Sequence, residues 1–263
     1  MNIRFFLGLV LACSASAQLV APNSMGVAMG HVHLTVRDMD ANKKFFATLG
    51  GTPVQNGPLE MIQFPNFYVL LRQGEPSAGS AGSAVNHFGF QVQKMQDWLP
   101  KWQAAGLKMD PIRRPDQVYL RTPDDVRIEI LEEPSIAAPI AGHHVHFVTQ
   151  DLPAMQAWYA KMFGAVPGKR AQFDNDLLPG VDLSFSSSTT PLAPTKGRAF
   201  DHLGFEIRNL PAFLAKLEAA GIKLDRPYTK IPNTSIAIAF FTDPWGAYVE
   251  LTEGLAPASA PSK

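Results

Sequence analysis

The stretch GHVHLTV, from Gly30 to Val36, decides the fold because the chain repeats it three more times in altered form. The related segments are NHFGFQV (86–92), HHVHFVT (143–149) and DHLGFEI (201–207). Each segment reads as the start of a β-strand. Together they contain all seven histidines of the chain. Histidines held on strands are typical of a metal site, so the pattern indicates chemistry as well as a fold.

An amphipathic helix follows each of these strands, and two of the helices are close copies. KMQDWLPKWQAAGLKMD (94–110) matches NLPAFLAKLEAAGIKLD (209–225) position by position. Three short strands follow each helix, so the chain reads as four β-α-β-β-β modules, an α+β arrangement. A single module leaves one face of its sheet exposed, and the modules must therefore pair.

The repeat also sets the predicted boundaries. A leader at 18–28 precedes a first domain at 29–132, and a second domain at 143–255 precedes a disordered tail at 256–263. The linker at 133–142 carries two prolines and small residues. Its ten residues let two complete domains sit side by side, so we favour modules that pair within each half. Exchange of modules between the halves is the alternative.

Residues 1–17 have the features of a signal peptide. Arg4 supplies the positive end, an apolar stretch follows, and an A-x-A site ends at Ala17. The apolar run is too short to span a bilayer. Cys13, the only cysteine, ends a segment that resembles a bacterial lipobox, so a lipid anchor is the alternative to cleavage after Ala17. We expect a secreted or periplasmic protein. If the chain is cleaved after Ala17, it keeps no cysteine and therefore has no disulfide.

The composition narrows the class of partner. The 263 residues are 46% hydrophobic, enough for a substantial core. Lys plus Arg and Asp plus Glu are both 23, and no basic run is present, so we do not expect nucleic-acid binding. We expect a small-molecule substrate, no stable membrane span, and a monomer or homodimer.

The motifs, taken in order, resemble the vicinal oxygen chelate superfamily, which includes glyoxalase I, fosfomycin-resistance enzymes and extradiol dioxygenases. The matching text is HVHLTVRDMDANKKFFATLGG, NHFGFQV and TPDDVRIEILEE in the first half. In the second half it is HVHFVTQDLPAMQAWYAKMFG, DHLGFEI and TDPWGAYVELTEG. The resemblance covers residues 29–254. It implies modules paired into two glyoxalase-like domains whose cupped mixed sheets hold a metal ion.

The resemblance also implies the ligands: a histidine on the first strand, a histidine opening the next module, and a glutamate on its last strand. Carried over to this chain, the metal ligands are His31, His87, Glu129, His144, His202 and Glu250. Pairing within halves groups the first three and the last three. Exchange groups His31 with His202 and Glu250, and His144 with His87 and Glu129. Such sets leave open metal positions and suit Fe(II), Mn(II), Ni(II) or Zn(II).

Three further histidines lie beside these ligands in the sequence. His33 and His146 share a strand face with His31 and His144, because side chains alternate along a strand. They are expected to contact substrate or a ligand, or else to pack beneath the metal. By the same alternation, His143 is expected on the opposite face, with a structural or surface role.

Three residues near Glu129 carry further predictions. Tyr119 stands where extradiol dioxygenases have a tyrosine, and it either hydrogen-bonds a substrate oxyanion or is a half-buried aromatic. Arg127 shares a face with Glu129, and it either binds an anionic substrate or forms a salt bridge. Asp125 replaces the glycine usual in the family's turn, which predicts a looser hairpin.

These residues support three functions. The first is a metal-dependent lyase or isomerase of the glyoxalase-like kind, acting on a small anionic or enolisable oxygen compound, with Glu129 or Glu250 as the base. Residues 67–74 and 181–188 lack the extra glutamate that glyoxalase I carries there, so hemithioacetals of glutathione are not expected as substrates. The alternatives are an Fe(II) ring-cleaving dioxygenase and a non-catalytic binding or resistance protein.

Overall fold

The computed structural model describes residues 19–256. The predicted signal peptide, Cys13, and residues 257–263 of the predicted tail lie outside the described residues. Within residues 19–256, none of the helices has the length and apolar character needed to cross a membrane.

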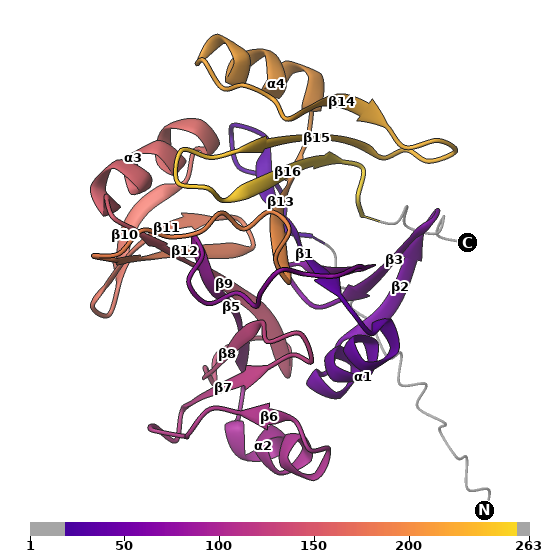
Figure 1. The fold of residues 1–263 in the computed structure, drawn as a ribbon, viewed down its shortest axis with the longest axis vertical. Helices are drawn as coiled ribbons and strands as arrows, with labels where there is room; N and C mark the ends of the chain where they lie inside the picture. The colour runs from indigo at the N-terminus through magenta and orange to yellow at the C-terminus, as the bar shows by residue number, and fades with distance from the viewer. Residues whose placement is uncertain (1–18, 257–263) are drawn as a thin grey trace, which may run out of the picture.

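Four β-α-β-β-β modules follow one another along the chain, as predicted (Figure 1). Module 1 consists of β1 (Val27–Val36), α1 (Met39–Leu49), β2 (Thr52–Asn56), β3 (Leu59–Gln63) and β4 (Tyr68–Gln73). Module 2 consists of β5 (Val85–Val92), α2 (Met95–Ala104), β6 (Lys108–Met109), β7 (Gln117–Arg121) and β8 (Arg127–Glu132). Module 3 consists of β9 (Ile140–Thr149), α3 (Leu152–Phe163), β10 (Val166–Arg170), β11 (Phe173–Leu178) and β12 (Val181–Ser187). Module 4 consists of β13 (Phe200–Ile207), α4 (Leu210–Ala219), β14 (Arg226–Lys230), β15 (Ala237–Thr242) and β16 (Tyr248–Glu253).

The helices of modules 1 and 3 begin and end at similar signals. The Asp38 side chain accepts a hydrogen bond from the Ala41 amide at 2.9 Å, and Asp151 caps α3 in the same way. Gly50 and Gly164 end these helices in the left-handed conformation, at φ 111° and 68°. Both ends follow the usual chemistry of helix caps.

The modules pair across the two halves of the chain. One sheet has the order β14-β15-β16-β13-β1-β4-β3-β2, and the other has the order β10-β11-β12-β9-β5-β8-β7-β6. Module 1 therefore shares a sheet with module 4, and module 2 shares a sheet with module 3. The preference for pairing within each half is wrong, since both pairings bury the same kinds of strand and the linker permits either.

Two antiparallel seams join the modules. In the first seam β1 pairs with β13, and in the second β9 pairs with β5. The register puts His33 opposite His202 and His87 opposite His146. Each seam therefore brings histidines from two modules together at the centre of a sheet.

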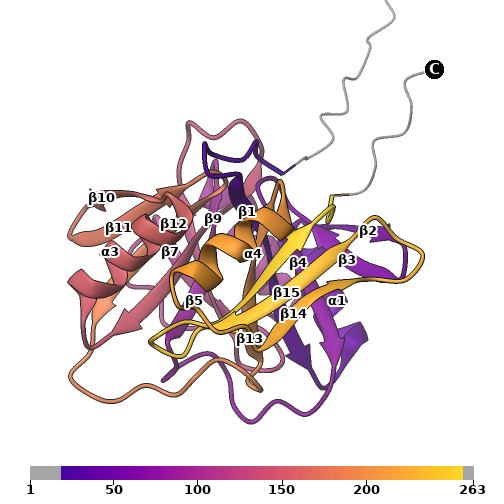
Figure 2. The ribbon, with the colours of Figure 1, turned by 90° about the horizontal axis from the view of Figure 1, so that it is seen from above.

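The main core lies between the two sheets. Side chains alternate, so Val32 and Leu34 of β1 face the core while the histidines of β1 face away from it. Phe88 and Phe200, from different sheets, have ring centroids 5.9 Å apart. Helices α1 and α2 contact each other, and Phe163 of α3 lies 5.8 Å from Phe213 of α4 between ring centroids. Figure 2 shows α3 and α1 on opposite sides of the molecule, with α4 in front.

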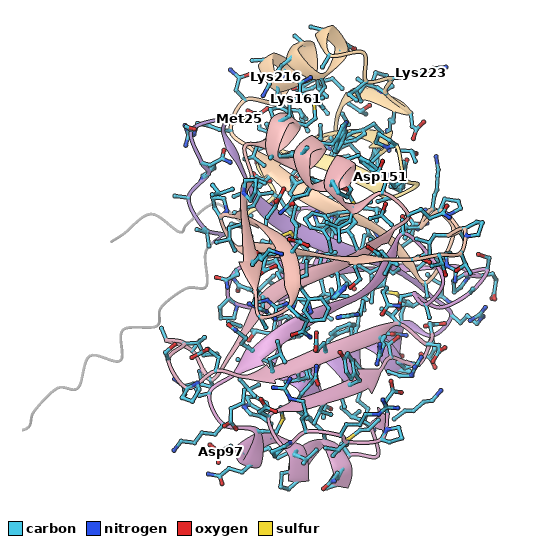
Figure 3. The ribbon with its side chains drawn as sticks, turned by 90° about the vertical axis from the view of Figure 1, so that its left-hand side faces the viewer. Met25, Asp97, Asp151, Lys161, Lys216 and Lys223 are labelled. Atoms are coloured by element: carbon cyan, nitrogen blue, oxygen red, sulfur yellow. The ribbon has the colours of Figure 1, made fainter. Side chains whose placement is uncertain are left out.

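The leader is tied to helix α3. Asn23 donates from Nδ2 to the carbonyl oxygens of Phe163 and Gly164, at 2.9 and 3.2 Å. These carbonyls end α3 and would otherwise lack a partner. Figure 3 labels Met25 near Lys161 and Lys216, where the leader passes the two helices of the second half. The leader is irregular up to β1, as predicted, but it packs on the fold.

The turn at Asp125 keeps the conformation of its counterpart. Asp125 has φ 61°, and Gly246, its equivalent in module 4, has φ 92°. The Asp125 amide donates to the Thr122 carbonyl at 3.0 Å, as the Gly246 amide donates to Asp243 at 3.1 Å. The expected looser hairpin is therefore not found. Asp tolerates the left-handed region better than most residues.

Candidate metal centres

The first candidate site, here called the His31 cluster, consists of His31 and His33 from β1, His202 from β13 and Glu250 from β16. Glu250 Oε2 lies 2.9 Å from Nε2 of His31 and 2.9 Å from Nε2 of His202. One ligand atom from each of the four residues lies within 4.8 Å of the others. The cluster therefore joins the first and last modules of the chain.

Glycine at position 204 is required by this arrangement. The His31 ring crosses over Gly204, and a Cβ built there would stand 2.0 Å from His31 Cε1. Gly89 has the same role in the other sheet, where a Cβ would stand 2.2 Å from His144 Cε1. The glycines of the HLGF and HFGF segments thus make room for a ligand from the partner module.

An aspartate orients His202. Asp201 Oδ1 lies 2.7 Å from His202 Nδ1, which leaves Nε2 facing Glu250. Burial alone would lower the pKa of His202, but hydrogen bonds to Asp201 and Glu250 outweigh burial and raise it. A carboxylate behind a histidine ligand fixes the tautomer and increases basicity.

His33 has no hydrogen-bond partner among residues 19–256. Both of its ring nitrogens are buried and unpaired, and its ring centroid lies 4.5 Å from that of His202. Burial, and then the nearby His202, hold the pKa of His33 well below its ordinary value. His33 is therefore a neutral imidazole with an available lone pair.

The His31 cluster fits a divalent cation. Two ligands of one octahedral or tetrahedral ion stand roughly 3.0–3.5 Å apart, close to the 2.9 Å between Glu250 and its two histidines. Burial would raise the pKa of Glu250, but His31 and His202 lower it well below its usual range, so Glu250 is a carboxylate. The two unpaired nitrogens of His33 add a third imidazole beside this carboxylate.

A cavity of about 500 Å³ opens onto the His31 cluster. Its walls include the four cluster residues, the cations Arg72, Lys196 and Arg226, and a group of apolar side chains from β3, β4, β15 and the chain beside them. This volume lies within the roughly 300–1,000 Å³ typical of sites for small organic molecules. A ligand can therefore reach this cluster.

The second candidate site, here called the His87 cluster, consists of His87 from β5, Glu129 from β8, and His144 and His146 from β9. Glu129 Oε2 lies 3.0 Å from His87 Nε2 and 2.9 Å from His144 Nε2. Ligand nitrogens of the three histidines lie within 4.8 Å of one another. Burial would raise the pKa of Glu129, but hydrogen bonds to His144 and His87 lower it far below its usual range.

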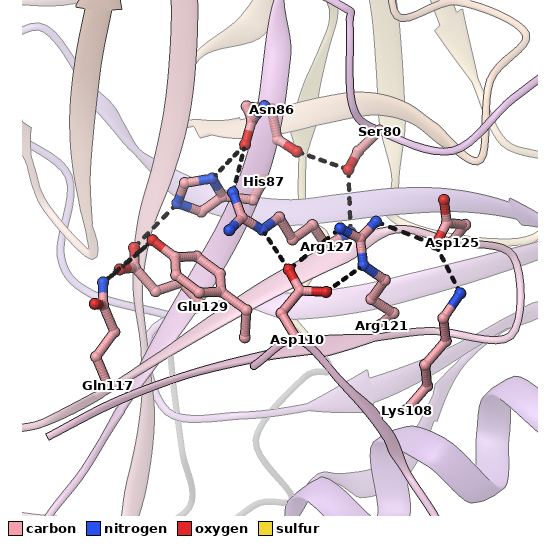
Figure 4. A network of polar contacts seen from close by, with 11 residues as sticks. Ser80, Asn86, His87, Lys108, Asp110, Gln117, Arg121, Asp125, Arg127 and Glu129 are labelled. Atoms are coloured by element: carbon pink, nitrogen blue, oxygen red, sulfur yellow. Dashed lines mark hydrogen bonds and ion pairs between the residues drawn. The ribbon is translucent and has the colours of Figure 1, made fainter. Parts of the chain in front are cut away.

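The second oxygen of Glu129 is already occupied. The Tyr119 hydroxyl donates to Glu129 Oε1 at 2.8 Å, and the Gln117 amide donates to the same oxygen (Figure 4). Burial, together with Glu129, raises the pKa of Tyr119, so its hydroxyl is protonated. Tyr119 is thus engaged with a ligand carboxylate, which leaves no free hydroxyl proton for a substrate.

Arg127 forms the salt bridge that was one of its two expected roles. Its Nε donates to Asp110 at 3.2 Å, and Arg121 binds the same carboxylate at 2.7 Å (Figure 4). The Arg127 guanidinium also lies over the Tyr119 ring, 3.6 Å from its centroid. A cavity of about 410 Å³ borders these residues, but its lining contains none of the histidines or Glu129 of the His87 cluster.

The support of the His87 ligands differs from that in the His31 cluster. His87 Nδ1 lies 2.9 Å from the amide oxygen of Asn86, where the His31 cluster has Asp201. Burial lowers the pKa of His87 and lowers that of His146 to about 3. His146 Nε2 lies 2.6 Å from the Ser186 hydroxyl, so His146 has a partner where His33 has none.

His143 does not face away from the cluster. A β-bulge between β5 and β9 pairs Gly89 with His144 but Phe90 with Gly142, so the alternation of side chains is broken. His143 Nδ1 lies 2.9 Å from His144 Nδ1. The expectation of opposite faces is therefore wrong, and His143 supports the ring of His144.

The residues that sequence reasoning left unassigned are mainly those behind the ligands and around the cavity. Asp201 and Asn86 precede equivalent histidines in two repeats, which was an available signal. Lys196 and Arg226 lie in a loop and on an edge strand, where no repeat marks them. Their place at the cavity depends on the pairing of modules.

Comparison with known proteins gives one family and one fold. The model of the family described as Glyoxalase/Bleomycin resistance protein/Dioxygenase superfamily matches residues 142–251. Glyoxalase I from Zea mays has a TM-score of 0.68 at 18% identity, covering 87% of this chain and 92% of that chain. A protein of Bacillus subtilis subsp. subtilis str. 168 described as a "putative dioxygenase" has a TM-score of 0.67 at 14% identity, covering 92% and 87%. These identities show likeness of fold alone. A search of curated proteins gave no match.

Proposed function

Because the chain carries a sequence domain of the glyoxalase, bleomycin-resistance and dioxygenase superfamily, we propose that it is a metal-dependent enzyme acting on a small oxygenated compound. The reaction site is the His31 cluster. One observation carries the assignment: a buried carboxylate lies 2.9 Å from two histidine nitrogens at the wall of a cavity of about 500 Å³. Its charge and donor set suit Fe(II), Mn(II), Ni(II) or Zn(II).

The bound ion would supply Lewis acidity toward a substrate oxygen. His31, His202 and Glu250 would hold the ion, and His33 offers a further nitrogen. Glu250 lines the cavity, so this carboxylate is assigned as the group that takes a proton from a bound substrate. Asp201 keeps His202 in the tautomer that presents Nε2 to the site.

The substrate is not expected to be a hemithioacetal of glutathione. On β4, the residue paired with His33 is Leu70, which lines the cavity. On β12 the residue paired with His146 is Ser184. Neither strand offers a second glutamate. With methylglyoxal and glutathione, we expect kcat/KM below about 10⁴ M⁻¹s⁻¹, the lower end for dedicated enzymes.

The His87 cluster has a supporting role in this proposal. Both oxygens of Glu129 are engaged, by histidines on one side and by Tyr119 and Gln117 on the other. A metal ion there would stabilise the second sheet rather than meet a substrate. The two glutamates therefore form a matched pair for testing.

The test begins with metal analysis of the purified mature protein, followed by a screen of hydroxy acids, keto acids and phenolics with the metal found. Glu250→Gln should lower kcat/KM by at least about 100-fold, the usual contribution of a general base. Glu129→Gln should leave activity within a few-fold of the wild type while altering stability. Full activity in the metal-free protein, or equal loss in both variants, would refute the proposal.

One observation favours a second candidate, the Fe(II) dioxygenase. His33 lines the cavity beside the cluster, and among residues 19–256 its two buried ring nitrogens have no hydrogen-bond partner, so its imidazole can contact a phenolic substrate. Anaerobic reconstitution with Fe(II), followed by oxygen uptake with catechols, separates this candidate from the first. A binding protein would instead purify without metal and bind ligand equally well in chelator.

The place of action is also proposed. We infer export from the cytosol because residues 1–17 read as a signal peptide. N-terminal sequencing of the exported protein tests this: Gln18 at the start supports cleavage after Ala17, and a lipid-modified Cys13 supports the anchor.

A further inference from the structure

The cup above the His31 cluster has an apolar wall that is separate from the main core. Ile236, Ile238 and Phe240 form one small group, and Met61, Tyr68, Leu70 and Leu255 form another. All of these except Met61 and Tyr68 line the cavity. Leu59 packs against both groups. Because the sheet buries its opposite face against the main core, these side chains are not needed to hold the helices. An apolar surface lining a cavity is typical of a ligand site.

Two cations stand at this cavity on a pair of stacked aromatic rings. Phe240 and Tyr248 have centroids 5.1 Å apart. Lys196 Nζ lies 4.3 Å from the Tyr248 centroid, and the Arg226 guanidinium lies 5.9 Å from the Phe240 centroid. Within residues 19–256, neither cation has a carboxylate at ion-pair distance. Their charges are therefore available to a ligand.

The acidic groups at the cavity are already engaged. Asp201 binds His202 at 2.7 Å and accepts from the Gly197 amide at 2.8 Å. Glu250 is held between His31 and His202. Arg72, the third cation, donates to Thr35 at 3.0 Å and lies 3.7 Å from Asp201. The charge left unpaired at the cavity is positive.

The cup of the other sheet is different. At its matching positions, Asp182 accepts from Arg170 at 3.1 Å, from Asn175 at 2.7 Å and from Ser184 at 2.7 Å. Asp182 and Ser184 pair with the histidines of β9 at the positions where Tyr68 and Leu70 pair with those of β1, so this wall of the second cup is polar. The combination of apolar wall and unpaired cations therefore belongs to the His31 cluster alone among the two cups.

We infer that the His31 cluster takes an amphipathic anion: one carboxylate or phosphate group on a hydrocarbon or aromatic body. Lys196 and Arg226 bind the anionic group, and the apolar wall covers the body. This inference rests on the proposed function for the identity of the reaction site, and it names the substrate class. It excludes small, fully polar acids as good ligands.

The experiment measures binding of straight-chain carboxylates of four to ten carbons, and of octyl phosphate, by calorimetry. The mature protein is measured with bound metal and again after the metal has been removed by a chelator. Affinity should rise roughly four-fold per methylene, the value for burial of about 0.8 kcal/mol. Octanol should bind at least about ten-fold more weakly than octanoate. The ratio between octanoate and octyl phosphate assigns the anionic group.

Matched variants test the two cations. Lys196→Gln and Arg226→Gln should each weaken octanoate binding in the chelated protein by roughly five- to thirty-fold, or about 1–2 kcal/mol. Lys223 and Arg208 do not line the cavity, so the control variants Lys223→Gln and Arg208→Gln should leave octanoate binding unchanged. Figure 3 labels Lys223 beyond helix α4. Affinity that is flat with chain length, or unchanged in both cavity variants, overturns the inference.

Measuring binding both with metal and after chelation separates this inference from the proposed function. A protein that binds no metal, but shows the chain-length slope and the loss in Lys196→Gln, supports the substrate class and refutes the metal enzyme. If the protein binds metal at the His31 cluster but its affinity does not rise with chain length, the metal enzyme is supported and the substrate class is refuted.

Discussion

Replacing Gly204 by alanine should disable the His31 cluster without touching a ligand. The added Cβ would stand 2.0 Å from Cε1 of His31 and 2.3 Å from its Nδ1. Real Cβ atoms do not approach a ring so closely, so either the imidazole or the β1–β13 seam must move. The His31 ring is what the added methyl group meets, and movement of the ring takes Nε2 away from Glu250.

The magnitude follows from overpacking in a tight interior. One forced methyl costs about 1–3 kcal/mol, which corresponds to a fall in melting temperature of roughly 2–12 °C for a protein of this size. If the ion is present at 100 times its dissociation constant, its loss removes about 2.7 kcal/mol more. Gly204→Ala should therefore melt lower and should no longer gain stability when metal is added back to the His31 cluster.

The assay is thermal melting with and without chelator, combined with metal content per chain. Gly168→Ala is the control, because a Cβ there would meet a side-chain oxygen at 3.2 Å, a contact that a small shift relieves. Gly89→Ala should damage the His87 cluster in the same way. If Gly204→Ala binds metal as tightly as the wild type and melts with Gly168→Ala, the explanation of the glycine is refuted.

Three further predictions concern metal, pairing and pH. Chelation should lower the free energy of unfolding by about 2.7 kcal/mol for each ion bound at 100 times its dissociation constant, measured by urea denaturation; unchanged midpoints count against metal in either cluster. His31→Ala and Glu250→Ala should abolish the same metal equivalent, and Glu129→Ala should abolish the other, measured by elemental analysis; grouping His31 with Glu129 would contradict the sheet order. Asp176 is fully buried, and burial raises its pKa to about 6. The native state then holds a proton that the unfolded chain releases near pH 4, so stability falls as pH rises through about 4–6. Asp176→Asn should remove this loss and gain about 1–3 kcal/mol over the wild type at pH 8 but not at pH 4; Asp97→Asn, at an exposed position of α2, should show no such difference.

Much of the fold was predictable because each module carries its own local signals. Caps such as Asp38 and stops such as Gly50 act within a few residues, and the repeat shows them more than once. The facing of His33 and His146 toward the clusters follows from strand alternation alone. These features depend on residues that are close in sequence.

The pairing of modules was not predictable in this way. Both pairings use the same six ligands, and the same strands bury the same faces, so no local signal separates them. The bulge at His143 is likewise a property of two strands in register and not of HHVHFVT itself. Lys196 and Arg226 reach the cavity of the His31 cluster only once module 4 shares a sheet with module 1.

The pairing of modules across the two halves also sets the order in which the parts of the protein can fold during synthesis. Modules 2 and 3 are neighbours in the chain, so β5 and β9 can pair soon after both have been made, and the His87 cluster can form early. His31 must wait for Glu250, 219 residues later. Non-local pairing of this kind slows folding, and until it happens β1 carries an unpaired edge with two histidines. The ligand-binding half of the molecule is thus expected to be the last part to fold, and the proposed enzyme should acquire its substrate cavity only when the chain is nearly complete.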